Sequence, residues 1–193
     1  MSERAEVLSM SELFRGRFFN PVADHTGWRW KNKQVDEFIS DLSKLSDNET
    51  LHLGTVLHKP HPKKAIVFGG LKLTPHTLFD GYQRLAIVRG LILSAATALC
   101  EIDSPMAKMQ ANSLQRQFGI VDGHERLQHA SVPPPDFPLP FPVSGQEAHD
   151  TLDAFLNRLS RQVTVLFYAT TSSKRAAQFT HRQAVRGLPS RED

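Results

Sequence analysis

The sequence has one cysteine, no long uninterrupted apolar run and only a mild charge imbalance. Cys100 is the single cysteine among 193 residues, which excludes an intramolecular disulfide and a zinc cluster built from cysteines. A reducing compartment fits this composition best, so we expect the protein to be cytoplasmic. Because Cys100 follows the apolar stretch at residues 91–99, we expect it to be a small core residue and not a nucleophile.

Segments that would direct the chain to a membrane are not apparent either. A helix needs about 18 uninterrupted apolar residues to span a bilayer, and the nearest approach, residues 87–99, is shorter and contains Arg89. Residues 1–6 are charged and lack the apolar run of a signal peptide. We therefore expect no membrane partner.

The size and charge of the chain set loose bounds on its function. A chain of 193 residues with 40% hydrophobic and 22% charged residues is typical of one globular domain. The formal charge of +3 allows contact with nucleotides or nucleic acid without requiring it. Basic residues are frequent over residues 174–191, which favours a solvated tail over a binding arm, and residues 187–193 are expected to be flexible.

The spacing of apolar residues predicts an α+β fold. Helical periodicity and strand-like alternation each recur several times, with no internal repeat. Six of the twelve prolines fall within residues 131–146, which predicts a surface loop. The predicted helices cover residues 31–45, 82–101, 106–118, 147–159 and 172–185, after a short amphipathic piece at 11–19; the predicted strands cover 51–57, 65–68, 71–79 and 162–168.

The most informative stretch is DGYQR, residues 80–84, between a predicted strand and the longest predicted helix. Gly81 has no Cβ and permits a tight reversal or a close backbone approach. Asp80 is placed to cap the first amides of the helix, and those amides form a natural seat for a phosphate. Arg84, one turn further on, presents a planar fork of donors to the same anion.

The simpler alternative is an ordinary Asp-capped helix with Arg84 solvated on the surface. Other catalytic signals do not compete with this motif. The sequence contains neither a Gly-rich Walker loop nor a Gly-x-Ser-x-Gly elbow. His124 and His129 lack acidic or cysteine partners at metal spacing, and His58 and His61 flank prolines in an expected loop. We therefore expect solvated histidines and no metal site formed by protein side chains.

Four ordered features carry a family resemblance. A Trp-Arg-Trp cluster at residues 28–30 precedes KQVDEFISDL at 33–42, then LHLGTVL at 51–57, then FDGYQRL at 79–85. In this order they resemble the N-terminal domain of the GmrSD-type restriction endonucleases, whose DGQQR motif opens a helix in a ParB/sulfiredoxin-like fold. The resemblance covers about residues 18–100 and resumes more faintly at 163–190. It implies a small mixed sheet flanked by helices, with a long buried helix after the DGYQR corner.

The resemblance also implies a function. Such domains bind nucleotides, often with NTP hydrolysis, in systems that restrict modified or phage DNA. The implied site comprises Asp80, Gly81, Tyr82, Gln83 and Arg84, with Asp80 and Arg84 as the catalytic candidates and an NTP with Mg²⁺ as the ligand. Tyr82 replaces the first Gln of the motif, and it either stacks on a base or ribose or packs in the core.

Two departures weaken the case for hydrolysis more than the case for the fold. The second Gln-Arg pair of the family, upstream of the tryptophans, aligns with His25 and Thr26, so one phosphate-binding arginine is lost. Arg29 is the candidate substitute. The C-terminal His-Asn-His-type nuclease domain of the family has no counterpart in this sequence, so we expect no nuclease activity from this chain alone and a separate nuclease or modification subunit as partner.

Two other functions remain open at this stage. Residues 182–186 also look like a segment of the sulfur-modification regulator family, whose motif is DGQHR, and this implies non-catalytic DNA binding. A degenerate remnant that acts only as a scaffold is the third possibility.

Overall fold

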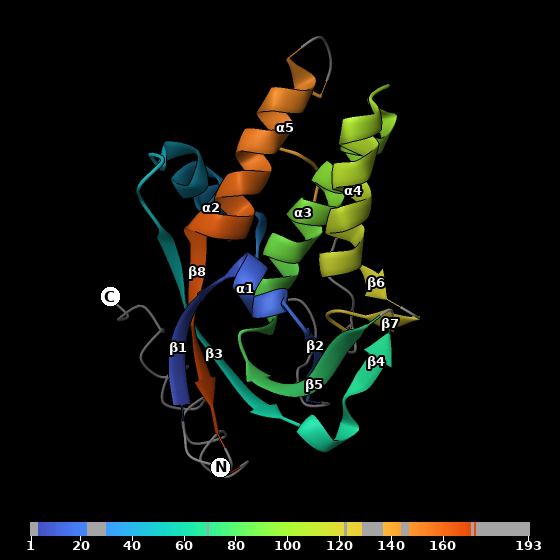
Figure 1. Cartoon of the computed structure of the whole chain (residues 1–193). Helices are drawn as coiled ribbons and strands as arrows, with labels where there is room; N and C mark the ends of the chain where they lie inside the picture. The colour runs from blue at the N-terminus through green and yellow to red at the C-terminus, as the bar shows by residue number, and fades with distance from the viewer. Residues whose placement is uncertain are drawn as a thin grey trace, which may run out of the picture.

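A mixed β-sheet carries the fold, and most of the helices gather along one side of it, as the computed structural model in Figure 1 shows. The structure describes residues 4–22, 30–68, 70–121, 123–128, 137–143, 147–170 and 172, with Phe68 described by its backbone only. The α+β class predicted from the sequence is therefore correct.

The main sheet has parallel and antiparallel neighbours in alternation. β1 pairs antiparallel with β8, β8 parallel with β3, β3 antiparallel with β5, and β5 parallel with β2. A short strand, β4, forms a hairpin with the first part of β5. In sheet order the strands are β1 (Arg4–Ser9), β8 (Val163–Ala169), β3 (Leu51–Pro60), β5 (Leu71–Asp80) and β2 (Arg17–Pro21), with β4 (Ile66–Phe68) beside β5. A separate two-stranded ladder joins β6 (Ile120–Val121) to β7 (His124–Glu125).

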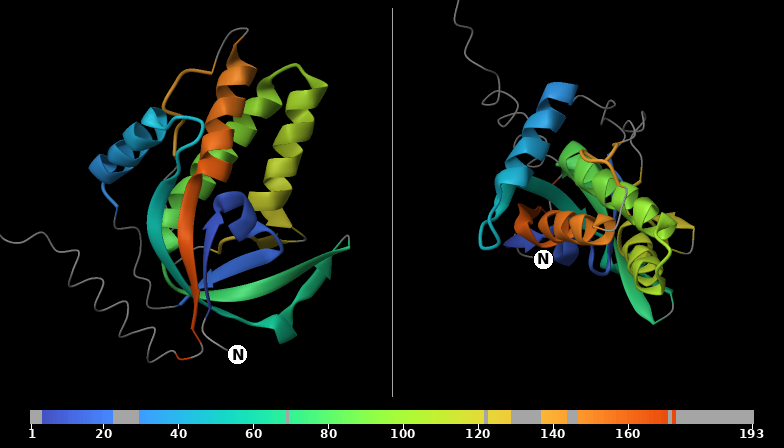
Figure 2. Two further views of the ribbon diagram at one scale, coloured as in Figure 1. Left: turned by 60° about the vertical axis from the view of Figure 1, so that its left-hand side comes forward. Right: turned by 90° about the horizontal axis from the view of Figure 1, so that it is seen from above.

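The longest helix, α3, lies in the centre of the core, next to α4 and α5 (Figures 1 and 2). Ten of its residues are buried, including Leu85, Ile87 and Leu91, so it is apolar nearly all round. Its length and composition would allow a membrane span, but 56% of its most apolar window is buried inside the protein, and a core helix satisfies the same criteria. The helices are α1 (Met10–Phe14), α2 (Asn32–Lys44), α3 (Tyr82–Glu101), α4 (Pro105–Phe118) and α5 (Ala148–Asn157), with a 3₁₀ turn η1 (Pro62–Lys64) and a π-helical turn η2 (Arg158–Gln162).

Most of the predicted elements are present. Helices α2, α3, α4 and α5 match the predictions to within two residues at each end, and β3, β4, β5 and β8 lie where strands were expected. The apolar stripe of α2 faces the core through Phe38 and Leu42. Residues 137–143 of the proline-rich loop are neither helix nor strand. The predicted helix at 172–185 and the tail at 187–193 lie outside the described residues, apart from Ser172.

The N-terminal segment differs from the prediction. Residues 11–19 are not one amphipathic piece: a short helix, α1, ends at Phe14, and an edge strand, β2, begins at Arg17. Gly16 separates the two with φ of 66°, a conformation that ends the helix. The strand β1 was not expected. It is an edge strand that is partly buried on one face only, and its charged residues conceal the alternation of apolar and polar positions.

Two single-residue expectations were wrong. Cys100 is exposed, because the buried face of α3 passes through Leu99, Ala96 and Ala95 and leaves Cys100 on the solvent side. His58 is buried, with 3% of its surface exposed, because β3 continues through Lys59 to Pro60 instead of ending before the first proline.

Pro75 shows how β5 tolerates a proline in its middle. β4 pairs with β5 at Leu71–Leu73 and β3 pairs with it from His76 onward, so Pro75 falls between the two partners. Its carbonyl accepts a hydrogen bond from the backbone N–H of His61 at 2.8 Å. No ladder bond is lost there, because the missing proline N–H has no strand partner to face.

Candidate functional site

The corner between β5 and α3 is built on a left-handed glycine. β5 ends at Asp80, Gly81 adopts φ of 94° and ψ of −1°, and α3 starts at Tyr82. A Cβ on Gly81 would lie 2.8 Å from Cγ2 of Val56 and 3.1 Å from its Cα. The corner therefore needs glycine twice, once for its backbone conformation and once for its contact with β3. The expected tight reversal and close approach are both present.

The expected cap is different. Gly81 is the N-cap residue of α3 and makes no side-chain capping bond, so Asp80 does not cap the helix amides. Instead, Oδ1 of Asp80 accepts the backbone N–H of Gly81 at 2.6 Å. The left-handed turn at Gly81 explains the difference, since it carries the chain past the carboxylate before the helix begins. The first-turn amides of α3 are thus left without a side-chain acceptor from Asp80.

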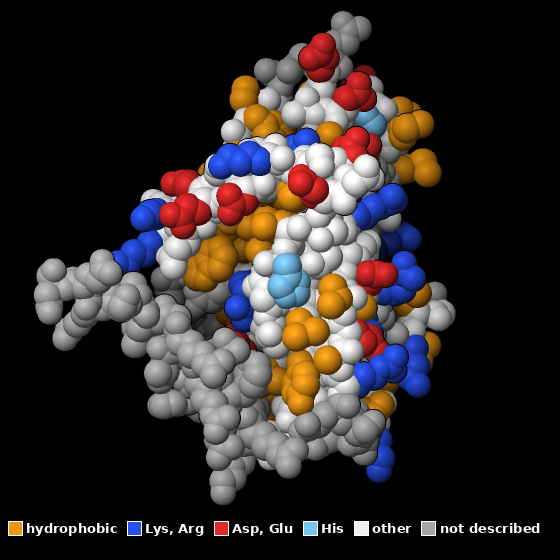
Figure 3. All heavy atoms as spheres, turned by 90° about the vertical axis from the view of Figure 1, so that its left-hand side faces the viewer, with side chains coloured by type: hydrophobic (Ala, Val, Ile, Leu, Met, Phe, Trp, Pro, Cys, Tyr) orange, Lys and Arg blue, Asp and Glu red, His pale blue; other side chains and the backbone are white. Residues whose placement is uncertain are grey.

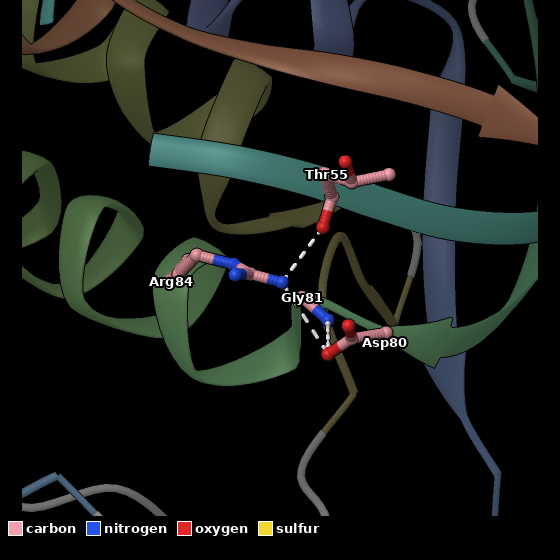
Figure 4. A network of polar contacts seen from close by, with 4 residues as sticks. All are labelled: Thr55, Asp80, Gly81 and Arg84. Carbon is pink, nitrogen blue, oxygen red and sulfur yellow. Dashed lines mark hydrogen bonds and ion pairs between the residues drawn. The ribbon is translucent and has the colours of Figure 1, made fainter. Parts of the chain in front are cut away.

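Arg84 reaches back from the first turn of α3 to β3 and to Asp80 (Figure 4). Its Nη2 donates a hydrogen bond to the carbonyl oxygen of Thr55 at 2.7 Å and lies 3.3 Å from Oδ1 of Asp80. The side chains of Arg84 and Asp80 are 26% and 27% exposed, so Arg84 is not solvated on the surface as the simpler alternative held. The Nε atom of Arg84 is buried and has no hydrogen-bond partner among the described residues.

Gly54 and Thr55 belong to this corner, although the sequence motifs assigned them no role. Gly54 has φ of 90°, and a Cβ there would lie 3.3 Å from Nη1 of Arg84. The pairing of β3 with β8 shifts register between His52 and Thr55, which places this glycine in an irregular part of the strand. A glycine inside a strand is a signal for a bulge or a close approach, and here the approaching group is a guanidinium.

The other predicted residues serve the fold around the corner. Tyr82 is 3% exposed and packs in the core, so of the two expected roles the packing role holds in this structure. The Oε1 atom of Gln83 accepts the backbone N–H of Trp30 at 2.9 Å, which ties the segment before α2 to α3. Arg29, the candidate substitute for the lost arginine, lies outside the described residues.

A metal site made by protein side chains alone is not found in the described part of the chain. No group of three or more His, Cys, Asp or Glu side chains comes together there. Asp80 is the single carboxylate among the corner residues, and its Oδ1 already accepts from Gly81 and faces Arg84. One carboxylate is enough for Mg²⁺ only when substrate phosphates and water supply the other ligands. The donor set therefore fits a metal–nucleotide complex and not a metal bound by itself.

A second polar cluster lies one step along the same two strands. The Nδ1 atoms of His58 on β3 and His76 on β5 are 2.9 Å apart, and the His58 ring stacks on Phe167 with centroids 3.5 Å apart. Burial lowers the pKa of His58 to about 2, helped by the charges of His76 and Arg17. Burial, Arg17 and His61 lower the pKa of His76 to about 3. Both rings are therefore neutral at pH 7, and one Nδ1 donates while the other accepts.

His61 and His124 do not join His58 and His76 to form a set of metal ligands. His61 is half-buried and its Nε2 lies 2.9 Å from the hydroxyl of Thr77. Instead of being solvated as expected, it is therefore held against β5. His124 is half-buried beside Phe18, with ring centroids 5.8 Å apart, and His129 lies outside the described residues.

An open depression of about 480 Å³ on another part of the surface contains none of the predicted residues. It lies over β1, α1 and β8, and its lining includes Glu12, Arg15 and Arg161. Glu12 is already engaged in the capping box of α1 with Ser9. The depression therefore offers no alternative to the corner for the predicted chemistry.

Comparison with known proteins adds no family. No protein-family model matches the chain, and no curated protein matches it in sequence.

Proposed function

We propose that the chain binds a nucleotide through its phosphates at the corner between β5 and α3. The observation that carries the proposal is the state of Arg84: its guanidinium is held by Thr55 and Asp80 through Nη2 alone, while Nε is buried without a partner among the described residues. A buried donor without an acceptor costs about 1–3 kcal/mol. A phosphate oxygen would supply that acceptor.

The neighbouring backbone supports the same ligand. The first N–H groups of α3 carry partial positive charge, and the N-cap residue Gly81 contributes no side-chain cap. Gly81 and Gly54, both with positive φ, let β3 and the Arg84 guanidinium pack closely at this corner. The positive charge of the Arg84 guanidinium adds attraction for phosphate oxygens.

Asp80 gives the site a requirement for a cation. A carboxylate 3.3 Å from the guanidinium repels a bare polyphosphate as it neutralises Arg84. Mg²⁺ bound to the nucleotide removes that repulsion, and the free oxygen of Asp80 would then face the hydrated ion. When bound, the ion would neutralise charge that develops on the phosphates during phosphoryl transfer. In that event Arg84 would hold phosphate oxygens, with Asp80 and Arg84 as the candidate catalytic pair.

We also infer the finer fold and the biological setting from the motif order. The fold is a ParB/sulfiredoxin-like domain of the type found at the N-terminus of GmrSD restriction endonucleases, and it serves a modification-dependent restriction or anti-phage system in the cytoplasm. A separate nuclease or modification subunit would act on the DNA. The mixed sheet and the long buried helix directly after DGYQR support this inference.

Isothermal titration with ATP, GTP, CTP and UTP in the presence of Mg²⁺ tests the proposal. We expect at least one nucleotide to bind the wild type and Arg84→Gln to weaken that binding tenfold or more. Arg116→Gln, at an exposed position on α4, is the matched control and should bind as the wild type does. Absence of binding to all four nucleotides, or equal binding by Arg84→Gln, would reject the proposal.

A further inference from the structure

The hairpin formed by β4 and β5, together with the η1 turn before it, concentrates positive charge. No Asp or Glu occurs between residues 50 and 79, whereas four lysines do. Three of these lysines are exposed and one is half-buried. None of the four makes an ion pair with a described residue. The lysines are Lys59, Lys63, Lys64 and Lys72.

Two of the four lysines act on the same histidine. Lys59 and Lys64 both lower the pKa of His61, after the larger effect of its partial burial. No carboxylate is among the groups that shift the pKa of His61, so the positive charges of the two lysines are not offset there. By contrast, acidic and basic side chains are interspersed on the face of the molecule shown in Figure 3. On α2, for example, Lys33 pairs with Glu37 at 3.7 Å.

The hairpin also has two well-separated faces. Ile66 and Leu73 are register partners and turn inward, where they join Phe18 and Val121 in a small apolar cluster of their own. Val67 and Lys72 are the next partners and turn outward, with Val67 73% exposed. The inward cluster fixes the hairpin to the body of the protein, so the outward face is presented by a rigid element.

The outward face combines charge with an exposed apolar side chain, because Val67 lies opposite Lys72 there. Leu71, next to the tip, is 59% exposed but lies on the other face, since it alternates with Lys72 along β5. Figure 2 shows the hairpin reaching out at the edge of the molecule, beyond the helices. A two-stranded ribbon of this kind fits the major groove of B-form DNA, where lysines contact phosphates and small apolar groups contact the thymine methyl. The deep, narrow major groove of A-form RNA does not admit it.

We propose that the β4–β5 hairpin and the adjoining residues 59–64 form a binding surface for double-stranded DNA, with Lys59, Lys63, Lys64 and Lys72 on the phosphates and Val67 in the groove. This inference does not depend on nucleotide binding at Arg84, because the two sets of residues are distinct. An acidic lipid surface is less favoured, since the two large apolar side chains that are exposed on the described part of the hairpin, Val67 and Leu71, lie on opposite faces.

Fluorescence anisotropy with a labelled 20-base-pair DNA duplex at several salt concentrations tests the proposal on the full chain. Four phosphate contacts predict a slope of about −3.6 in the plot of log affinity against log salt, so the affinity should fall roughly 100-fold between 50 and 200 mM salt. The combined variant Lys63→Gln, Lys64→Gln and Lys72→Gln should reduce the slope to about −1. Val67→Ser should weaken binding severalfold without changing the slope.

The matched control carries the same change in net charge elsewhere. Lys33→Gln, Lys44→Gln and Lys108→Gln lie on α2 and α4 and should keep the wild-type slope. An equal loss of slope in this control would place the binding outside the hairpin and overturn the proposal. So would the absence of duplex binding, equal affinity for an RNA duplex of the same sequence, or binding to phosphatidylserine vesicles without binding to DNA. All variants change exposed side chains, and an unchanged thermal melt verifies that each is folded.

Failure of this proposal and failure of nucleotide binding can be told apart. The triple lysine variant should bind nucleotide as the wild type does, and Arg84→Gln should bind duplex as the wild type does. A variant that loses both activities while still folded would contradict the separation of the two surfaces.

Discussion

Two polar pairs lie near each other beside β5, and one is charged whereas the other is neutral: Arg84 on α3 pairs with Asp80 on β5, and His58 on β3 pairs with His76 on β5. At the corner, Arg84 and Asp80 are an ion pair with about a quarter of each side chain exposed. One step along the strands, His58 and His76 are 3% and 5% exposed and neutral. In the ladder Leu57 pairs with Asp80 and His58 pairs with Leu78, so the two polar pairs lie on either side of the register shift between Leu57 and His58.

Burial decides the difference between the pairs. Desolvation disfavours the charged form of any group, and a histidine can escape the cost by losing its proton whereas an arginine cannot. Arg17 near the histidines adds a positive charge that further opposes their protonation. The corner keeps its charges because it keeps contact with solvent. The Arg84–Asp80 pair is therefore the one of the two that can bind an anionic ligand.

The largest expected effect is an acid sensitivity set by the histidine pair. Both folded-state pKa values lie far below the ordinary value of 6.5, so the unfolded chain binds more protons than the folded one as the pH falls below 6.5. Each histidine then costs about 1.4 kcal/mol of stability per pH unit, which gives roughly 4 kcal/mol for the two between pH 7 and pH 5 as an upper bound. Urea unfolding at a series of pH values measures this loss.

A double variant isolates the histidines from other titrating groups. His58→Phe with His76→Leu should remove most of the loss between pH 7 and pH 5, whereas His52→Gln, at an exposed position on β3, should leave it unchanged. If the double variant loses as much stability over this range as the wild type, the pair is not the source of the acid sensitivity.

The next effect concerns the backbone of the corner. Gly81→Ala should destabilise the protein by about 3 kcal/mol, because the left-handed conformation costs about 1–2 kcal/mol and the contact with Val56 adds overpacking. Gly70→Ala is the matched control: Gly70 has φ of 80° and a Cβ there would meet nothing within 4 Å, so only about 1 kcal/mol is expected. Thermal or urea unfolding compares the two, and equal losses would show that the contact between Gly81 and Val56 is unimportant.

The sequence predicted the corner better than its surroundings. Gly81 and the start of α3 follow from the local pattern, since a glycine between a strand and an apolar helix has few other uses. The contact of Arg84 with Thr55 does not, because the two residues are 29 positions apart and meet only through the pairing of β3 with β5. The cap assigned to Asp80 failed for a related reason: one left-handed residue redirects the carboxylate, and its conformation is set by packing against Val56.

The histidine pair was missed because its burial depends on the whole sheet. His58 stands next to Lys59 and Pro60, a local context typical of a loop, and its stacking partner Phe167 lies on β8. The prediction for Cys100 was wrong in the opposite direction, because a core position was expected and the residue is exposed. A long apolar run does not reveal which side of a helix faces solvent when most of its residues are apolar. In both cases local composition was a poor guide to burial, which tertiary packing determines.

The smallest effect on stability is expected for the charge of Asp80. Asp80→Asn keeps an oxygen that accepts from Gly81 and removes the ion pair with Arg84, which at this exposure should cost no more than about 1 kcal/mol. The effect of this substitution on ligand binding should be larger than its effect on stability, and it should differ between solutions without and with Mg²⁺. Without Mg²⁺ the variant should bind pyrophosphate more tightly than the wild type, and with Mg²⁺ it should gain less from the metal. Tighter binding by the wild type in the absence of Mg²⁺ would contradict the role assigned to Asp80.

The most direct test of the central claim observes the Nε–H group of Arg84 itself. In a ¹⁵N-labelled protein its resonance is identified by its disappearance in Arg84→Lys. The account predicts that saturation with the nucleotide and Mg²⁺ shifts this resonance and the backbone amides of residues 81–84 more than any other described part of the chain. A nucleotide that binds while these signals stay in place, or titration without any shift, would contradict phosphate binding at the corner.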